Sequence, residues 1–295
     1  MNHFFNQKYL GCWLILAAAL SSTDVVSANI ETQSVKNVPR VVAAGGSITE
    51  ILYALGAQDF LVGVDSSSLY PADAATIANV GYYRQLSVEG VMSVNPTLIL
   101  GLDTMGPSSV LAQLKSLNVT VTKIPLERSI SGLTNIINQL GQLVNKPHEA
   151  EHLITKTTQQ LTRIPDLSAS ESRVIFLMSA NSNGLMAAGK DTVPNLIFEL
   201  LKVANPLAHI DGFKPVSNEV VMAINPNLIL IPSHRQAGRS AAEICQLPSL
   251  ALWAQKRGCN IKFVDPLSFL GITPRLAEAA LQVGKWLDGI DNDDA

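Results

Sequence analysis

The chain has 295 residues, of which 47% are hydrophobic and 15% are charged, and its formal net charge is -3. This length suffices for two lobes that each bury a hydrophobic core. Without a basic excess or basic runs, there is no electrostatic reason to expect nucleic acid or an anionic membrane surface as a partner. Small neutral or apolar ligands remain open.

The first residues have the pattern of a secretory signal peptide. Lys8 precedes an apolar run at 9–20, and small and polar residues follow this run as far as Ala28. Spanning a bilayer takes roughly 20 apolar residues, so this run is too short for an anchor. Cys12 comes before most of the apolar run, whereas a lipidated cysteine should follow it. We therefore expect export, cleavage near Ala28 and no stable membrane insertion.

Short apolar runs rich in β-branched residues alternate with helical patterns along the rest of the chain. The runs lie at 40–44, 60–64, 97–101, 119–124, 173–179, 228–232 and 261–264. Strands without polar alternation, separated by helices, indicate parallel sheets covered on both faces. Helices are predicted at 47–55, 108–117, 130–143 and 274–287, and the first of them opens with Ser47 and Glu50 as a capping box.

A polar amphipathic stretch at 147–163 begins with a proline and ends just before another, which predicts one long helix. A near-repeat lies on either side of it. The segments SVEGVMSVNPTLIL from Ser87 and SNEVVMAINPNLIL from Ser217 are identical at nine of fourteen positions, with a constant offset of 130 residues. We interpret the chain as an α/β protein with two Rossmann-like lobes, each with a central parallel sheet, joined by the long helix.

The expected boundaries follow from this interpretation. They are 1–28 for the signal peptide, 29–145 for the N-terminal α/β lobe, 146–165 for the linker helix, 166–289 for the C-terminal α/β lobe and 290–295 for a frayed acidic tail. The cleft between the lobes is the expected ligand site. A helical linker predicts only modest closure of the lobes.

Each copy of the repeat carries a glutamate in the first turn of a predicted helix, Glu89 in one and Glu219 in the other. A serine that can act as N-cap precedes each of them. An acidic residue at this place stabilises a helix through the helix dipole, which is sufficient to explain either glutamate. Equivalent carboxylates on two lobes would also suit arginines on a two-fold symmetric partner. The residues leave docking and helix capping as alternatives.

Two adjacent tyrosines and an arginine, Tyr82, Tyr83 and Arg84, precede the first copy of the repeat and have no counterpart before the second. Loop tyrosines often pack their rings and keep the hydroxyl in water. The alternative is coordination, because a phenolate is a hard donor that suits ferric iron and serves as an axial ligand of haem. A ferric ion and the Arg84 guanidinium would both favour the ionised phenol.

Other patterns that could bind metal or catalyse a reaction are weaker. His148 and His152 lie four residues apart on the predicted linker helix, but no third ligand is evident, which favours a solvated helix face. His234 and Arg235 follow a predicted strand at its carboxyl end, where open α/β sheets bind ligands, and Arg239 is a further candidate. An ordinary polar loop is the alternative there.

No phosphate-binding loop, nucleophile elbow or nucleophile–base set is found, so we expect no enzyme.

Cys245 and Cys259 are the two cysteines that remain after removal of the leader. Export to an oxidising compartment favours a disulfide between them. Two unpaired buried thiols remain the alternative, because sequence alone cannot place the sulfur atoms within bonding range.

Together these features resemble the substrate-binding proteins of haem-import ABC transporters, within the larger class whose two lobes are joined by one rigid helix. The most specific segment is VGYYRQLSVEGVMSVNPTLIL at 80–100, which is similar to the family's Gly-Tyr-x-Arg-x-Leu-Ser-x-Glu-Gly segment. The segments MAAGKDT at 186–192 and FLGITPR at 269–275 add to the resemblance. It implies a periplasmic, monomeric, non-enzymatic protein that carries haem to the permease subunits of an importer.

The resemblance also implies roles for single residues. Tyr82 matches the axial ligand of the haem iron, and Arg84 matches the arginine that hydrogen-bonds it. Glu89 and Glu219 match the pair that docks on permease arginines. Members with two haems use a histidine in the loop that here reads SANSNG at 179–184, so a single haem is expected. The further candidate haem contacts are Tyr83, His234, Arg235 and Arg239, and a ferric siderophore or cobalamin carrier of the same class is the alternative.

Overall fold

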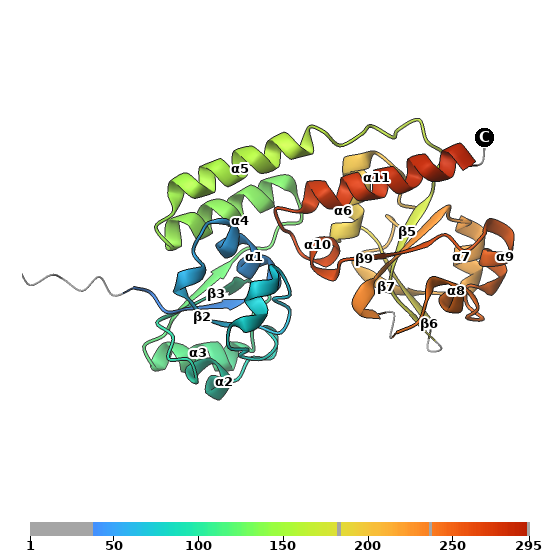
Figure 1. Cartoon of the computed structure of the whole chain (residues 1–295). Helices are drawn as coiled ribbons and strands as arrows, with labels where there is room; N and C mark the ends of the chain where they lie inside the picture. Colours follow the sequence, from blue (N-terminus) through green and yellow to red (C-terminus); the bar gives the residue numbers. More distant parts are fainter. Residues whose placement is uncertain (1–37, 182–183, 236–237, 294–295) are drawn as a thin grey trace, which may run out of the picture. The chain divides into compact units, whose positions relative to one another are not determined.

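The computed structural model describes residues 38–181, 184–235 and 238–293 of the chain. The expected signal peptide, with Cys12 and Ala28, and part of the SANSNG loop lie outside the described residues. Within the described ranges no helix is both long and apolar enough to cross a bilayer. Two β-sheets follow one another along the chain, each with helices packed on it, which confirms the predicted α/β class (Figure 1).

The first sheet is four-stranded and entirely parallel, in the order β2-β1-β3-β4. Every residue of the central strand β1 is buried, as expected for a parallel strand covered on both faces. The strands are β1 (Val41–Ala44), β2 (Leu61–Val64), β3 (Leu98–Leu102) and β4 (Thr120–Ile124). The helices are α1 (Gly46–Ala54), α2 (Val88–Met92), α3 (Ser108–Ser116) and α4 (Ile130–Leu143), with 3-10 turns η1 (Gln58–Phe60) and η2 (Ala72–Thr76).

The second sheet has the order β7-β6-β5-β8-β9. Its strands β5 (Val174–Asn181), β8 (Leu228–Pro232) and β9 (Ile261–Val264) are parallel, whereas β6 (Gly184–Ala188) and β7 (Phe213–Val216) add an antiparallel edge. The sequence did not predict this edge. Its pattern indicated strands separated by helices, whereas an antiparallel neighbour needs only a short connection and no crossover helix. The helices are α6 (Val193–Leu201), α7 (Asn218–Ile224), α8 (Ala241–Cys245), α9 (Ala251–Arg257), α10 (Pro266–Leu270) and α11 (Leu276–Asp293), with the 3-10 turn η3 (Ser233–Arg235).

The predicted long helix is α5 (Pro147–Leu161), which follows α4 and precedes the second sheet. It packs on α4 and on α11, whose run to Asp293 extends into the stretch expected to be a frayed tail (Figure 1). One continuous hydrophobic cluster includes Leu140 of α4, Leu153 of α5 and Phe198 of α6. Separate clusters cover the other face of each sheet. Because the two lobes share one core, rotating them against each other would disturb packed side chains.

The sequence repeat is also a structural repeat. Ser87 and Ser217 are the N-caps of α2 and α7, and each side chain accepts a hydrogen bond from the backbone N–H three residues on, at 3.0 and 3.5 Å. Asn95, two residues after the C-cap of α2, and Asn225, the C-cap of α7, have φ angles of 46° and 49°, a left-handed conformation that asparagine tolerates. The same local chemistry therefore builds one helix-turn-strand unit in each lobe.

The predicted capping box at the start of α1 does not form. The helix begins at Gly46 with Gly45 as its N-cap, and no side chain accepts a capping hydrogen bond. Ser47 consequently lies inside the first turn and is buried. Glu50 is buried as well and pairs with Arg275 instead of a backbone N–H. The predicted N-cap, Ser47, therefore lies two residues beyond the true N-cap, Gly45.

Candidate functional site

Tyr82 occupies the first position of a tight turn between β2 and α2. The N–H of Gln85 donates to the carbonyl of Tyr82 at 2.8 Å, which closes the turn. Gly81 enters it with a φ of 101°, a backbone conformation that only glycine adopts without strain. The local sequence Gly-Tyr-Tyr-Arg-Gln thus sets the shape of this turn.

The main chain of Tyr83 is held on both sides. Its N–H donates to Asp65 Oδ2 at 3.3 Å, and its carbonyl accepts from the N–H of Gly106 at 3.0 Å. The Tyr83 ring is half-buried against the hydrophobic cluster of the first lobe. This residue anchors the turn to the sheet.

Tyr82 is the exposed member of the pair, with 41% of its surface accessible. Its ring meets the Tyr83 ring edge-on, with centroids 4.9 Å apart. Such an edge-to-face contact restricts how the outer ring can turn. The turn therefore presents one phenol at the surface on a supported ring.

Arg84 contacts Tyr83, whereas the resemblance implied a hydrogen bond from Arg84 to Tyr82. Its Nε donates to Tyr83 Oη at 2.8 Å, and its guanidinium carbon lies 5.2 Å from the centroid of the Tyr83 ring. The expected hydrogen bond from Arg84 to Tyr82 is therefore replaced by one to Tyr83. The anchored ring holds its hydroxyl within reach of the next residue, which explains the exchange.

Burial raises the pKa of the Tyr82 phenol, and the neighbouring Tyr83 raises that pKa further. The charge of Arg84 lowers the pKa of Tyr82, but it does not reverse the overall direction. Arg84 thus favours the ionised phenol, as expected, but its charge does not bring the pKa of Tyr82 below the ordinary value. Since a metal ligand must be deprotonated, a cation that binds Tyr82 has to displace the phenolic proton.

The basic candidates of the second lobe lie on turns at the end of its sheet. His234 and Arg235 form the exposed turn η3 directly after β8. Burial lowers the pKa of His234, and the charge of Arg235 lowers it further. Arg239 Nη2 donates to the carbonyl of Ala180 on β5 at 3.2 Å. Each lobe thus carries its candidate residues beyond the carboxyl ends of its parallel strands, the usual place for ligands in such folds.

Glu89 and Glu219 occupy equivalent places in the first turns of α2 and α7, and both are exposed. Hydrogen bonds from the Ser217 side chain and from its own backbone lower the pKa of Glu219. This glutamate is therefore a carboxylate at neutral pH. The equivalent positions of Glu89 and Glu219 fit both helix capping and docking.

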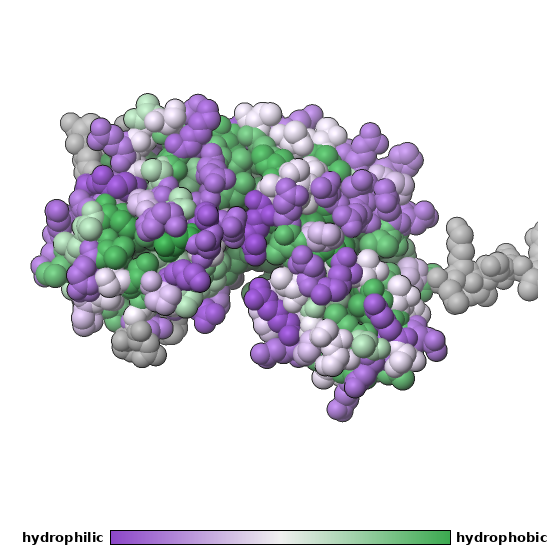
Figure 2. Space-filling model, turned by 180° about the vertical axis from the view of Figure 1, so that it is seen from behind, coloured by the Kyte–Doolittle hydropathy of each residue, from purple (hydrophilic) through white to green (hydrophobic). Residues whose placement is uncertain are grey.

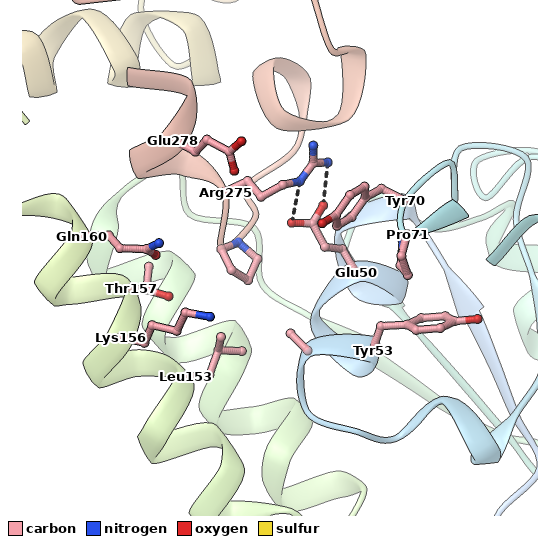
Figure 3. Close-up of a pocket in the computed structure, with 12 residues that line it drawn as sticks. Glu50, Tyr53, Tyr70, Pro71, Leu153, Lys156, Thr157, Gln160, Arg275 and Glu278 are labelled. Atoms are coloured by element: carbon pink, nitrogen blue, oxygen red, sulfur yellow. Dashed lines mark hydrogen bonds and ion pairs between the residues drawn. The ribbon is translucent and has the colours of Figure 1, made fainter. Parts of the chain in front are cut away.

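A cavity of about 390 Å³ lies between α1, α5 and the start of α11 (Figure 3). Arg275 projects into its wall from the segment just before α11 and pairs with Glu50 of α1 (Figure 3). None of the residues predicted to contact haem lines it. The lining residues are Glu50, Tyr53, Ala54, Tyr70, Pro71, Leu153, Lys156, Thr157, Gln160, Pro274, Arg275 and Glu278.

Two further predictions concern the two cysteines and the histidine pair of the linker helix. Cys245 and Cys259 form a disulfide, with Cα atoms 6.0 Å apart. His148 and His152 are both exposed on α5. In the part of the chain that the structure describes, no three His, Cys, Asp or Glu side chains cluster in a way that could hold a metal ion.

Asp65 is the functional candidate that the sequence reasoning missed. It stands directly after β2, at the carboxyl end of a parallel strand, and three serines follow it. That position was a usable signal, because polar residues at strand ends of α/β sheets commonly serve ligand sites. Its side chain is buried and accepts the N–H of Tyr83.

Residues 41–254 match the family model described as periplasmic binding protein. A solved structure, the periplasmic heme-binding protein RhuT from Roseiflexus sp. RS-1 in apo form, is 30% identical with a TM-score of 0.78, covering 85% of this chain and 98% of that one. An uncharacterized ABC transporter substrate-binding lipoprotein, YvrC of Bacillus subtilis, is 27% identical over 72% of this chain and 71% of its own. The vitamin B12-binding protein of Vibrio parahaemolyticus is 24% identical over 74% and 80%.

The chain belongs to the periplasmic binding protein family. It is a substrate-binding protein of the ABC-transporter kind, in the class with haem-, vitamin B12- and siderophore-binding members. The family binds solutes, and its class works with permease partners.

The face opposite to the view of Figure 1 is hollowed at its lower edge, with hydrophilic residues on both sides of the hollow (Figure 2).

Proposed function

We propose that the protein captures ferric haem in the periplasm and delivers it to the permease of an ABC importer. Tyr82 serves as the axial ligand of the iron. The observation that best supports this proposal is an exposed phenol on a turn whose backbone is fixed by hydrogen bonds on both sides. The 30% identity with a protein named as heme-binding supports the same ligand.

In this proposal the ligand enters as a flat apolar macrocycle whose burial provides most of the affinity. The Tyr82 oxygen then bonds the iron, and its proton leaves to solvent. Tyr83 and Arg84 act beside it, because their hydroxyl–guanidinium bond places a positive charge next to the phenol. His234, Arg235 and Arg239 are the candidate donors for the haem propionates from the second lobe.

Glu89 and Glu219 are the proposed contacts with the permease. They occupy the same position of the repeated unit in the two lobes, and both carboxylates are exposed. Arginine side chains on two permease subunits would pair with them in the same geometry. The protein acts as a monomer that carries a single haem.

Cobalamin is the second candidate ligand, because a relative that matches 74% of this chain is named as a vitamin B12-binding protein. A cobalamin carrier has no need for an exposed phenol as a ligand for ferric iron. Tyr82 should therefore be dispensable if cobalamin is the natural ligand.

Ligand titrations of the exported chain separate the two candidates. Ferric haem, iron-free protoporphyrin and aquocobalamin are each added to the protein, and visible spectra are recorded. We expect tight binding of ferric haem, weaker binding of the iron-free porphyrin and no cobalamin complex. Tight cobalamin binding, or equal affinity for haem and for the iron-free porphyrin, would contradict the proposed role of Tyr82.

A further inference from the structure

Asp65 gathers an unusually complete set of hydrogen bonds at the end of β2. Only 1% of its surface is exposed. Its Oδ1 accepts from the N–H of Gly45 at 3.0 Å and from the hydroxyls of Ser67 and Ser68 at 3.0 and 2.9 Å. Its Oδ2 accepts from the N–H and hydroxyl of Ser67 at 3.1 and 2.8 Å and from the N–H of Tyr83 at 3.3 Å.

These partners belong to three separate segments of the chain. Gly45 precedes α1, the serines form the turn after β2, and Tyr83 belongs to the turn that carries Tyr82. The backbone joins the last two segments a second time, because the N–H of Ser66 donates to the carbonyl of Gly81 at 2.9 Å. Asp65 therefore holds the Tyr82 turn against the end of the sheet.

Both oxygens of Asp65 are used as acceptors, and none of the ion pairs formed by the described residues includes it. A buried carboxylate without a cation is costly unless hydrogen bonds satisfy it. An asparagine amide would direct an NH2 group at one set of N–H donors in either orientation. The site is thus built for a carboxylate and would reject its closest isostere.

We propose, resting on the function proposed above, that Asp65 is a positioning residue for ligand binding, which sets the direction of the Tyr82 phenol by fixing the Tyr83 backbone. Asp65 does not touch the ligand. It acts through the turn, whose other fixed point is the bond between the Tyr83 carbonyl and Gly106. Losing the Asp65 contact would free one side of the turn and let the phenol leave its orientation.

The test compares Asp65→Asn with Ser68→Ala as a matched control. Ser68→Ala removes one hydroxyl from Asp65 and from Thr49, which lies 2.7 Å from that hydroxyl, but leaves the Tyr83 bond intact. Outer contacts of a metal ligand typically change affinity about 10–100-fold, so Asp65→Asn should weaken ferric-haem binding by about that factor. Its spectrum should also lose the phenolate-to-iron charge-transfer band, while the control keeps wild-type affinity and spectrum.

Amide hydrogen exchange on the protein without ligand provides a second measurement. Asp65→Ala, which removes both acceptor oxygens, should speed the exchange of the Tyr83 N–H, whereas the same N–H should keep its wild-type exchange rate in Ser68→Ala. Circular dichroism checks that each variant is folded, and Asp65→Ser, whose oxygen takes the place of the carboxyl carbon, replaces Asp65→Asn if that variant does not fold.

The outcomes separate this proposal from the proposed function. If Tyr82→Ala loses haem binding but Asp65→Asn binds like the wild type with the same spectrum, the role of Asp65 is overturned and the haem function stands. If wild type and Tyr82→Ala bind ferric haem alike, the role of Tyr82 as iron ligand fails, and the positioning role of Asp65 fails with it, whereas a wild type that binds no haem overturns the haem function itself. Unchanged Tyr83 exchange in Asp65→Ala overturns the positioning role by itself.

Discussion

Glu50 of the first lobe and Arg275 of the second form a bidentate ion pair, with Arg275 Nε and Nη2 donating to the two carboxylate oxygens at 3.1 and 2.9 Å. Glu50 is only 3% exposed. Arg275 also donates to Asp265 at 3.1 Å, and its guanidinium carbon lies 3.8 Å from the centroid of the Tyr70 ring. The arginine thus joins α1 and the loop before α11 across the junction of the lobes.

Removing the arginine should be strongly destabilising. Arg275→Ala leaves the Glu50 carboxylate buried without its cation, and breaking such pairs costs about 3–5 kcal/mol. Urea unfolding measures the loss. Lys202→Ala is the matched control, because it breaks the exposed Lys202–Asp166 pair, and exposed pairs contribute about 0–1 kcal/mol. Equal losses of unfolding free energy in the two variants would show that the Glu50–Arg275 pair stabilises the protein no more than an exposed pair does.

Glu50 also predicts a pH dependence of stability. Burial raises the pKa of Glu50, and Arg275 offsets only part of that increase. A carboxyl group with a raised folded-state pKa contributes stability below its unfolded pKa, and this contribution is lost as the pH rises through the folded value. The free energy of unfolding of the wild type relative to Glu50→Gln should therefore fall as the pH rises from about 4 toward 7. A difference that grows with pH would contradict this assignment.

The proposed role of Tyr82 predicts that haem affinity rises with pH, because the pKa of its phenol lies above the ordinary value and the iron would bind the phenolate. Below that pKa, each pH unit changes the phenolate fraction by about tenfold, which sets the upper limit of the effect. Titrations of ferric haem between pH 6 and 9 measure the slope, with Tyr82→Ala as the pH-independent control. A flat profile in the wild type would exclude proton release from Tyr82.

The proposed docking role of Glu89 and Glu219 can be separated from helix capping. Replacing Glu89 and Glu219 together by glutamine keeps the side-chain shape but removes both charges. We expect unchanged haem affinity and a loss of stimulated ATP hydrolysis by the permease complex. The control is the Ser87→Ala and Ser217→Ala pair, which should cost about 1 kcal/mol of stability per cap and leave stimulation intact. Full stimulation by the glutamine variant would reject docking.

The sequence predicted the α/β class, the long helix α5 and the repeated helix-strand unit, because each depends on local patterns. The helix at 130–143 was predicted to the residue, since Ser129 caps it and its apolar face is periodic. The antiparallel edge of β6 and β7 was missed. A short strand at a sheet edge has a mixed pattern of burial that does not distinguish parallel from antiparallel pairing.

The sequence named the residues near the candidate ligand site but not their contacts. Arg84 was expected on Tyr82, whereas it bonds Tyr83, because only the fold decides which of two adjacent tyrosines is anchored. Asp65 and Tyr83 are 18 residues apart, and Glu50 and Arg275 are 225 apart. No local pattern signals such long-range pairs, although the segment FLGITPR that contains Arg275 was already noted for its resemblance.

The most direct measurement is the visible spectrum of ferric haem bound to two single-atom variants, Tyr82→Phe and Tyr83→Phe. They delete one hydroxyl each from neighbouring residues, so differences in folding should be small. Tyr82→Phe should lose the phenolate-to-iron band and bind haem more weakly, whereas Tyr83→Phe should keep the band. If both variants keep the wild-type spectrum, or if only Tyr83→Phe loses the band, Tyr82 is not the iron ligand.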